Sequence, residues 1–472
     1  MSNAINSREG LALTQPTNQK NSVRKNTIVF TIAFATMFFA SMIWILSRSG
    51  EQAGPPAPWN VDGIFYDNIA FNINRGEGFA VDLFAQPWRE TYLPPQPPNG
   101  DHMDSNYKWL GPLKGTGPTA LRSPAYPYAL SLVYRMFGHR YDVARIFGCL
   151  FVSLGLALLL TFSESRWGYL PALIAAVTLT TDYSIMLSAG TLATESLAIL
   201  IFAITFLLVI NAYERSSVLL WAIAGFSFAA LMLTRGIWSL GYLILIVSLV
   251  GFWIPPIRNR LGLFQQKHLV AFLAVATIVA MPWWIRNCQT TGHFTPFGTA
   301  GSCGFVAAYC DESLEDHGQW QTDVFNRNQI EVNKTVDMDT IKLADLEYLI
   351  GQESMRKTKA WCLANWTQIP QLMWHRGLSH WGFFNPSVTR PFQIANIWLI
   401  VVGLVGCFFA TGTSRGVFIV VLLIDTLLVT LTWEHLGRYA IPIRPVVHIG
   451  YGLAITTTIR AIARNSWRAP QN

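Results

Sequence analysis

The sequence predicts an all-α polytopic membrane protein with about ten transmembrane helices, interfacial helices in the first outer loop and a large second outer loop. The chain of 472 residues is 51% hydrophobic and only 13% charged, whereas soluble domains contain about 25% charged residues. Its mean hydropathy is +0.32. The apolar residues form runs of about twenty, the length at which a helix spans the hydrocarbon core. These runs exclude an ordinary soluble enzyme, a disordered chain and an outer-membrane barrel, whose strands alternate in polarity.

The first apolar run covers residues 27–47 and follows a polar tail at residues 1–26. A cleaved signal peptide has a shorter apolar core, so this run predicts a retained membrane anchor. The further predicted spans cover residues 142–163, 169–188, 191–211, 218–234, 237–254, 269–285, 394–411, 416–432 and 441–460.

The basic residues predict the orientation of these spans. Lysine and arginine accumulate before the first span, at alternate turns and in the tail at 461–472. By the positive-inside rule, both termini are expected in the cytoplasm, and short polar ends favour a bacterial inner membrane. The residues behind this bias are Lys20, Arg24, Lys25, Arg166, Arg215, Arg258, Arg260, Lys267, Arg415, Arg460, Arg464 and Arg468.

This orientation sends two long polar segments to the extracytoplasmic side. The predicted core, 27–285, contains the first outer loop at 48–141. A separate outer unit covers 286–393, and the last transmembrane helices cover 394–460. Connections this long predict folded extramembrane units. Cys303 and Cys310 lie in the second unit, where they either pair in an oxidising compartment or remain free thiols.

Charged residues recur at the outer ends of the spans, where each must be hydrated, paired or bound to an ion. Asp62 begins an apolar stripe at 61–79 that predicts an amphipathic helix on the membrane surface. Its carboxylate is either a helix cap or a functional acid. Arg122 lies in a second segment of this kind, at 121–138, where it contacts lipid headgroups or a substrate.

The other outer charges come from later spans. Asp182 and Glu195 bracket a turn of small residues, and Arg235, Arg286 and Arg438 follow at later span ends. Arginines placed in this way can hold a phosphate, and carboxylates can act as a general base or bind a metal ion. The combination suits a lipid-phosphate substrate and a hydroxyl acceptor. A net charge of +7 is explained by the orientation of the spans and indicates no nucleic-acid partner.

An ordered series of short motifs resembles the GT-C membrane glycosyltransferases, in particular glycosyltransferase family 39, the protein O-mannosyltransferase and lipid A aminoarabinose transferase type. The family often has Asp-Glu at the first motif, where this chain has Asp62-Gly63. It also often has Arg-Pro where this chain has Arg235-Gly236. The motifs are Asp62 with Tyr66, R-x-P-x-Y-P at 122–127, T-E at 194–195, P-W-x-x-R-N at 282–287 and R-Y-x-x-P at 438–442.

This resemblance implies an enzyme that transfers a sugar from a polyprenyl-phosphate donor to a protein, lipid or glycan acceptor by inverting displacement. Asp62 matches the family's catalytic position. Four arginines, Arg122, Arg286, Arg438 and Arg235, are candidates for the donor phosphate, and Glu195 and Asp182 for the sugar or a divalent cation. No cofactor is certain. Tyr66, Trp283 and Tyr439 either line the donor or belong to the aromatic belt of the membrane interface.

Two other functions stay open from the sequence. A flippase or exporter of lipid-linked sugars would place ionisable residues at mid-membrane depth, and Asp425, inside a late apolar run, fits that pattern. A polymerase or ligase of surface polysaccharide would share the transferase chemistry and differ in its acceptor.

Overall fold

The computed structural model describes residues 15–47, 61–83, 88, 116–251, 266–338, 340–384, 390–435 and 437–466. Within these ranges the regular secondary structure is helical except for one two-residue antiparallel pairing, β1 (Ala80–Val81) with β2 (Gly117–Pro118), and an isolated bridge. The predicted all-α polytopic class is therefore confirmed. Much of the first outer loop lies outside the described residues, as do Arg258, Arg260 and Arg468 of the predicted basic pattern.

Six described helices are long and apolar enough to cross a membrane, or seven spans if one bent pair counts as a span. The bent pair and three shorter apolar helices coincide with the other predicted spans. The exact count of ten is not confirmed, because these three helices are shorter than the candidate spans. The six are α1 (Gln15–Leu46), α6 (Tyr141–Trp167), α9 (Thr194–Glu214), α13 (Gln266–Thr291), α20 (Gly412–Leu431) and α21 (Arg444–Ser466). The shorter ones are α10 (Val218–Thr234), α11 (Trp238–Gly251) and α19 (Arg390–Cys407).

The bent pair replaces the single span predicted at 169–188. It consists of α7 (Tyr169–Thr181) and α8 (Tyr183–Gly190), whose axes differ by 62°. Asp182 separates the two helices in an extended conformation, and its carboxylate accepts hydrogen bonds from the backbone amides of Ser184 and Ile185. It thus caps α8 and satisfies amides that the break in the helix leaves without carbonyl partners.

Glycines allow the backbones of α19 and α21 to approach closely. A Cβ atom on Gly406 would lie 1.8 Å from the carbonyl oxygen of Gly450, and one on Gly450 would lie 2.1 Å from that of Gly403. Small residues serve this purpose in membrane bundles, where the lipid supplies no hydrophobic drive for helices to associate.

Gly406→Ala should therefore force α19 and α21 apart and lower the free energy of unfolding by about 1–3 kcal/mol. Gly416→Ala in α20 is the matched control, because a Cβ there meets no heavy atom within 4 Å. Thermal unfolding in detergent micelles measures both variants. Equal melting temperatures for the two would contradict the close approach.

The first outer loop contributes two helices, α3 (Val61–Asn74) and α5 (Ala125–Phe137). Both predicted helices are present, and α3 is covered by protein on the face that the sequence predicts to be apolar. All residues from Gly63 to Ala70 are buried, because α3 packs against α5 and is covered by protein. Asp67 fixes its position: the buried carboxylate accepts from Tyr134 at 2.5 Å, His139 at 2.8 Å and Trp88 at 2.9 Å.

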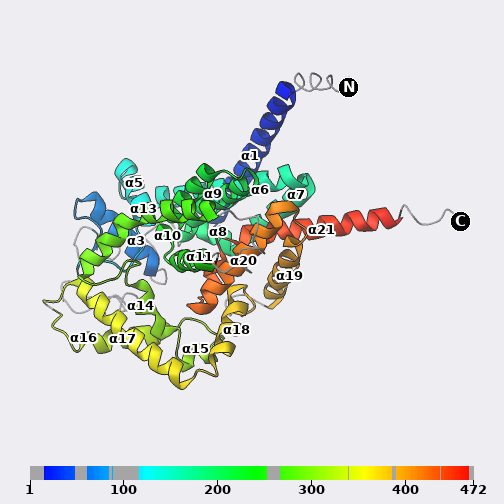
Figure 1. The fold of residues 1–472 in the computed structure, drawn as a ribbon. Coiled ribbons are helices and arrows are strands. Elements are labelled where there is room, and N and C mark those ends of the chain that lie inside the picture. The colour runs from blue at the N-terminus through cyan, green and yellow to red at the C-terminus, as the bar shows by residue number, and fades with distance from the viewer. Residues whose placement is uncertain are drawn as a thin grey trace, which may run out of the picture.

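The helices of the second outer segment gather together on one side of the bundle, whereas the free ends of α1 and α21 project away from them (Figure 1). The longest described helix of this segment is α17, with 22 residues. Cys303 and Cys310 are both buried free thiols, so they do not form a disulfide in this structure. The elements are α14 (Ala300–Gly304), the 3-10 turn η2 (Phe305–Ala307), α15 (Asp311–Glu315), α16 (Thr322–Asn333), α17 (Leu343–Ala364) and α18 (Ile369–His380).

Candidate active site

Five charged side chains from distant parts of the sequence meet in one group, here called the arginine cluster. Its members are Asp62 in the first turn of α3, Arg122 before α5, Glu195 in the first turn of α9, Arg235 after α10, and Arg438 in the 3-10 turn η3 (Arg438–Ala440). Each was a predicted site residue, and each lies at or beyond the end of a helix.

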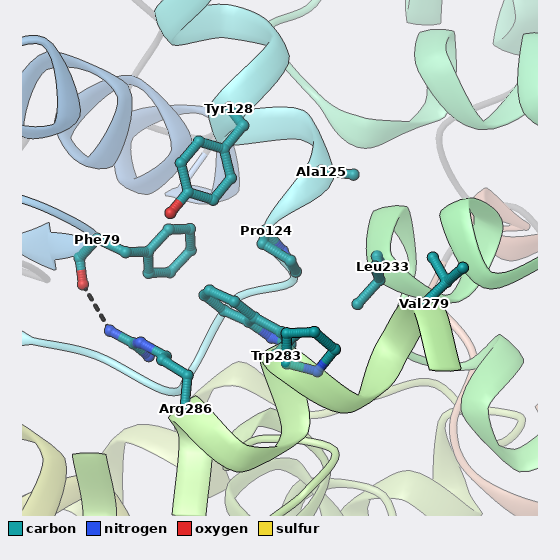
Figure 2. Close-up of a pocket in the computed structure, with 9 residues that line it drawn as sticks. Phe79, Pro124, Ala125, Tyr128, Leu233, Val279, Trp283 and Arg286 are labelled. Atoms are coloured by element: carbon teal, nitrogen blue, oxygen red, sulfur yellow. Dashed lines mark hydrogen bonds between the residues drawn. The ribbon is translucent and has the colours of Figure 1, made fainter. Parts of the chain in front are cut away.

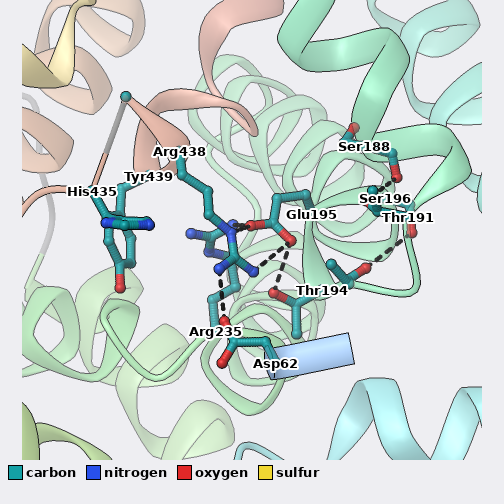
Figure 3. Close-up of polar contacts among 12 residues, drawn as sticks. Asp62, Ser188, Thr191, Thr194, Glu195, Ser196, Arg235, His435, Arg438 and Tyr439 are labelled. Carbon is teal, nitrogen blue, oxygen red and sulfur yellow. Dashed lines mark hydrogen bonds and ion pairs between the residues drawn. The ribbon is translucent and has the colours of Figure 1, made fainter. Parts of the chain in front are cut away.

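Arg438 joins the two carboxylates of the cluster (Figure 3). Its Nη1 donates to Asp62 Oδ2 at 2.6 Å, and its Nε donates to Glu195 Oε1. The other Asp62 oxygen, Oδ1, lies 2.8 Å from Arg122 Nη2. Arg235 forms a second ion pair with Glu195, with 3.2 Å between Nη1 and Oε1.

The cluster is buried on one side and open on the other. The side chains of Arg235 and Glu195 are 6% and 3% exposed, whereas those of Arg438 and Asp62 are 31% and 25% exposed. Three guanidinium groups face two carboxylates, which leaves a surplus positive charge. Arg122 also has a buried Nε atom with no hydrogen-bond partner among the described residues.

The two guanidinium groups make Asp62 a strong acid. Burial raises the pKa of its carboxyl group, but the charges of Arg122 and Arg438 more than offset this and hold the pKa well below its usual range. Asp62 is therefore ionised at physiological pH. While both ion pairs persist, it is also a weak base.

Aromatic rings pack against the arginines. The Arg235 guanidinium lies 5.0 Å from the ring centre of Tyr439, and that of Arg122 lies 6.0 Å from the ring of Tyr66. The Tyr439 hydroxyl accepts a hydrogen bond of 2.6 Å from Trp433 Nε1. The predicted aromatics Tyr66 and Tyr439 thus contact the cluster, which a belt residue facing only lipid would not do.

Glu434 and His380 hold the loop that presents Arg438. Glu434 Oε1 accepts from the backbone amides of His435 and Gly437 at 2.7 and 2.8 Å, and Oε2 lies 3.0 Å from His380 Nδ1. The other imidazole nitrogen lies 2.7 Å from Asp425. Asp425, which the sequence leaves as a candidate for a carrier function, is here a buried acid paired with histidine.

Arg286 and Trp283 lie apart from the cluster, beside a pocket of about 430 Å³ (Figure 2). Arg286 donates to the backbone oxygens of Thr119 and Phe79, the latter at 2.8 Å, and its guanidinium lies 4.8 Å from the Trp283 ring. Arg286 therefore holds the backbone of the segment that carries Arg122, through the oxygen of Thr119.

Glu347 of α17 holds the same segment from the outer unit. Its carboxylate accepts from the Thr119 hydroxyl, from the Ala120 amide at 3.0 Å and from the Thr299 hydroxyl at 3.1 Å. Burial raises the pKa of Glu347, and these three donors only partly offset it. The outer unit therefore positions Arg122 through a buried carboxyl group.

Asp182 belongs to a different buried network. Besides capping α8, its carboxylate accepts from Arg444 Nε at 2.8 Å and lies 2.9 Å from His448 Nε2. Arg444 in turn donates to Asn396 at 2.7 Å. None of these partners is a cluster residue, so the structure does not bring Asp182 together with Glu195.

The described residues contain no group of three or more His, Cys, Asp or Glu side chains placed to hold a metal ion. In the cluster itself, arginines surround both carboxylates. The donor set present there fits an anion better than a divalent cation.

Sequence reasoning missed the residues that support the cluster, namely Asp67, Glu347 and His380. It also missed Arg444 and His448, the partners of Asp182 in the separate network. Asp67 offered a signal, since it interrupts the apolar stripe that follows Asp62. The others act through contacts between segments far apart in the chain, which no local pattern reveals.

The comparisons with known proteins agree with the motifs. Residues 121–285 match the family described as dolichyl-phosphate-mannose-protein mannosyltransferase. The predicted resemblance to GT-C membrane glycosyltransferases is thus confirmed. The matched segment contains Arg122, Glu195 and Arg235. No curated protein sequence matches the chain.

Solved structures of two GT-C proteins are similar at low identity. The oligosaccharyltransferase AglB of Archaeoglobus fulgidus in its apo form is 13% identical, with a TM-score of 0.49, 93% of this chain covered and 52% of that chain. ArnT of Cupriavidus metallidurans bound to undecaprenyl phosphate is 11% identical, with a TM-score of 0.37, 93% of this chain covered and 78% of that chain. The chain spans about half the length of the archaeal protein.

The buried His380 predicts a pH dependence of stability. Burial lowers its pKa, but Asp425 and Glu434 more than offset this and raise it from 6.5 to about 9. Protonated His380 therefore stabilises the folded state fully below 6.5, its pKa in the unfolded chain, and this stabilisation is lost as the pH rises through about 9. We expect the melting temperature of the wild type to fall between pH 6.5 and 9. The variant His380→Gln should be less stable at pH 7, and its melting temperature should change less over the same pH range. An unchanged slope in the variant would contradict this assignment.

Proposed function

We propose that the protein is a membrane glycosyltransferase that moves a sugar from a polyprenyl-phosphate donor to a hydroxyl group of an acceptor on the extracytoplasmic face. The observation that carries this proposal is the arginine cluster, in which one partly exposed carboxylate is held between two guanidinium groups. The family match at residues 121–285 supports the same chemistry. The basic residues at alternate turns support the orientation, with both termini cytoplasmic in a bacterial inner membrane.

In this proposal Asp62 is the general base. Its carboxylate accepts the proton of the attacking hydroxyl, whose oxygen bonds to the anomeric carbon on the face opposite the lipid phosphate. The bond from that carbon to the phosphate oxygen breaks, and the phosphate keeps the electron pair. Arg122 and Arg438 stabilise the charge that the phosphate gains. Glu195 and Arg235 form the buried side of the site, where they pair with each other and Glu195 also pairs with Arg438.

The ion pairs of Asp62 suggest how donor binding activates the base. A phosphate that takes hydrogen bonds from Arg122 and Arg438 competes with Asp62 for the same guanidinium groups. Each guanidinium group that turns from Asp62 to the phosphate raises the pKa of Asp62 toward the range of a useful base. The donor therefore prepares the carboxylate that deprotonates the acceptor, and without donor that carboxylate stays a weak base.

We assign the other predicted residues supporting roles. Arg286 and Trp283 hold the segment that carries Arg122, and Asp182 caps the break between α7 and α8. The outer unit from 286 to 393 is placed to select the acceptor, which can be a protein, a lipid or a surface glycan. Loops vary in sequence more than the elements that they connect, so in this proposal the outer unit determines the acceptor while the membrane core holds the donor.

The decisive experiment follows release of polyprenyl phosphate from a panel of labelled polyprenyl-phosphate sugars, with purified protein in liposomes. Asp62→Asn should reduce release about 10²–10⁴-fold, the usual contribution of a positioned base. Asp142→Asn is the matched control and should keep wild-type rates, since the one ion pair of Asp142 within the described residues is with the exposed Arg140. Movement of intact lipid-linked sugar without release would instead indicate a carrier.

The pH profiles test the activation by donor. The acid limb of kcat/KM for the donor reports free Asp62, whose pKa lies well below its usual range, and the acid limb of kcat reports the complex. As the pH is lowered, we expect kcat to fall first, at a higher pH than kcat/KM. Coincident acid limbs would show that donor binding leaves the ion pairs of Asp62 intact.

A further inference from the structure

A second pocket lies at the end of the bundle opposite the arginine cluster. It has a volume of about 270 Å³ and is lined by the ends of α6, α7 and α21 and by the turn between α19 and α20. Helix α9 connects the two regions. Glu195 of the cluster lies in its first turn, and Glu214, its last residue, pairs with Arg166 of the pocket. At 1.5 Å per residue, these two ends are about 30 Å apart.

The polar lining of this pocket favours an anion. Arg166 is ion-paired with Glu214, but Arg460 has no hydrogen bond or ion pair among the described residues. Two guanidinium groups therefore face one carboxylate. The hydroxyl groups of Thr411, Thr456 and Thr457 complete the polar lining.

Thr456 has a buried hydroxyl group that lacks a partner. Its residue is 2% exposed, and its Oγ1 makes no hydrogen bond within the described part of the chain. Threonine in a helix usually donates to the carbonyl four residues earlier, as Thr458 does to Ala454 at 3.0 Å. A buried hydroxyl without a partner is unfavourable. The Thr456 hydroxyl is thus available for a ligand in the pocket.

The rest of the lining is apolar. Trp167, Pro171, Phe409 and Leu453 border the same space, and Phe409 is 46% exposed. A free phosphate ion would leave these surfaces without a partner. A molecule with an anionic head and an apolar body satisfies both halves of the pocket.

We propose that this pocket binds the phosphate headgroup of an anionic phospholipid from the surrounding bilayer. Basic pockets between transmembrane helices bind such headgroups. The lipid would contact α6, α7 and α21 together, and binding to the folded state alone stabilises that state by mass action. The site is separate from the proposed donor site, because it lies at the opposite helix ends.

Thermal unfolding and native mass spectrometry of the delipidated full-length protein test this site. Phosphatidylglycerol should raise the melting temperature and remain bound, whereas phosphatidylcholine with the same acyl chains should do neither. Arg460→Gln should weaken phosphatidylglycerol binding about fivefold, the usual contribution of one basic residue. Thr456→Val should weaken it about tenfold, because it removes a hydrogen bond to a charged group.

Arg464→Gln is the matched control. It removes the same charge one turn further along α21, from an exposed residue that does not line the pocket, and it should bind phosphatidylglycerol as the wild type does. Equal losses in Arg460→Gln and Arg464→Gln would overturn the proposal in favour of diffuse attraction. Stabilisation by inorganic phosphate alone would overturn the lipid assignment. Both outcomes are independent of sugar transfer, so they leave the proposed activity untouched.

Discussion

The contact of Arg438 with Asp62 and Glu195 is the interaction on which the rest of the site depends. It joins the first outer helix, the start of α9 and the loop before α21, which are separated by most of the chain. A charge as buried as that of Glu195 is tolerated only when it is paired. Removing Arg438 would leave two carboxylates without their shared cation. The ion pairs of Arg438 therefore hold the three segments together, in addition to packing.

Three cluster residues, Asp62, Arg122 and Arg438, have supports that take no part in the proposed reaction. Asp67 fixes α3 and so Asp62, Glu347 and Arg286 fix the segment of Arg122, and Glu434 with His380 fixes the loop of Arg438. These supports come from the bundle and from the outer unit alike. The outer unit is therefore part of the proposed catalytic site and more than an acceptor-binding addition.

The carboxylates at the outer span ends separate into two networks with different consequences. Glu195 and Asp62 share arginines in a region that is partly open, whereas Asp182 is enclosed with Arg444 and His448 where α7 and α8 bend. Both networks contain arginine and acid, so composition does not distinguish them. Exposure does, because the side chains of Arg438 and Asp62 are 31% and 25% exposed, whereas those of Arg444 and Asp182 are 7% and 2% exposed.

The order and polarity of the segments could be read from the chain alone. Helix length and apolar runs follow from the thickness of the bilayer, and the predicted orientation follows from charge bias; both are local properties. The short motifs also placed Asp62, Arg122, Glu195, Arg235 and Arg438 in one candidate site. Their partners could not be foreseen. Arg438 contacts a carboxylate, whereas Arg286 contacts a backbone carbonyl. Which of the two an arginine contacts depends on how packing brings the helix ends together, and the local sequence does not contain that information.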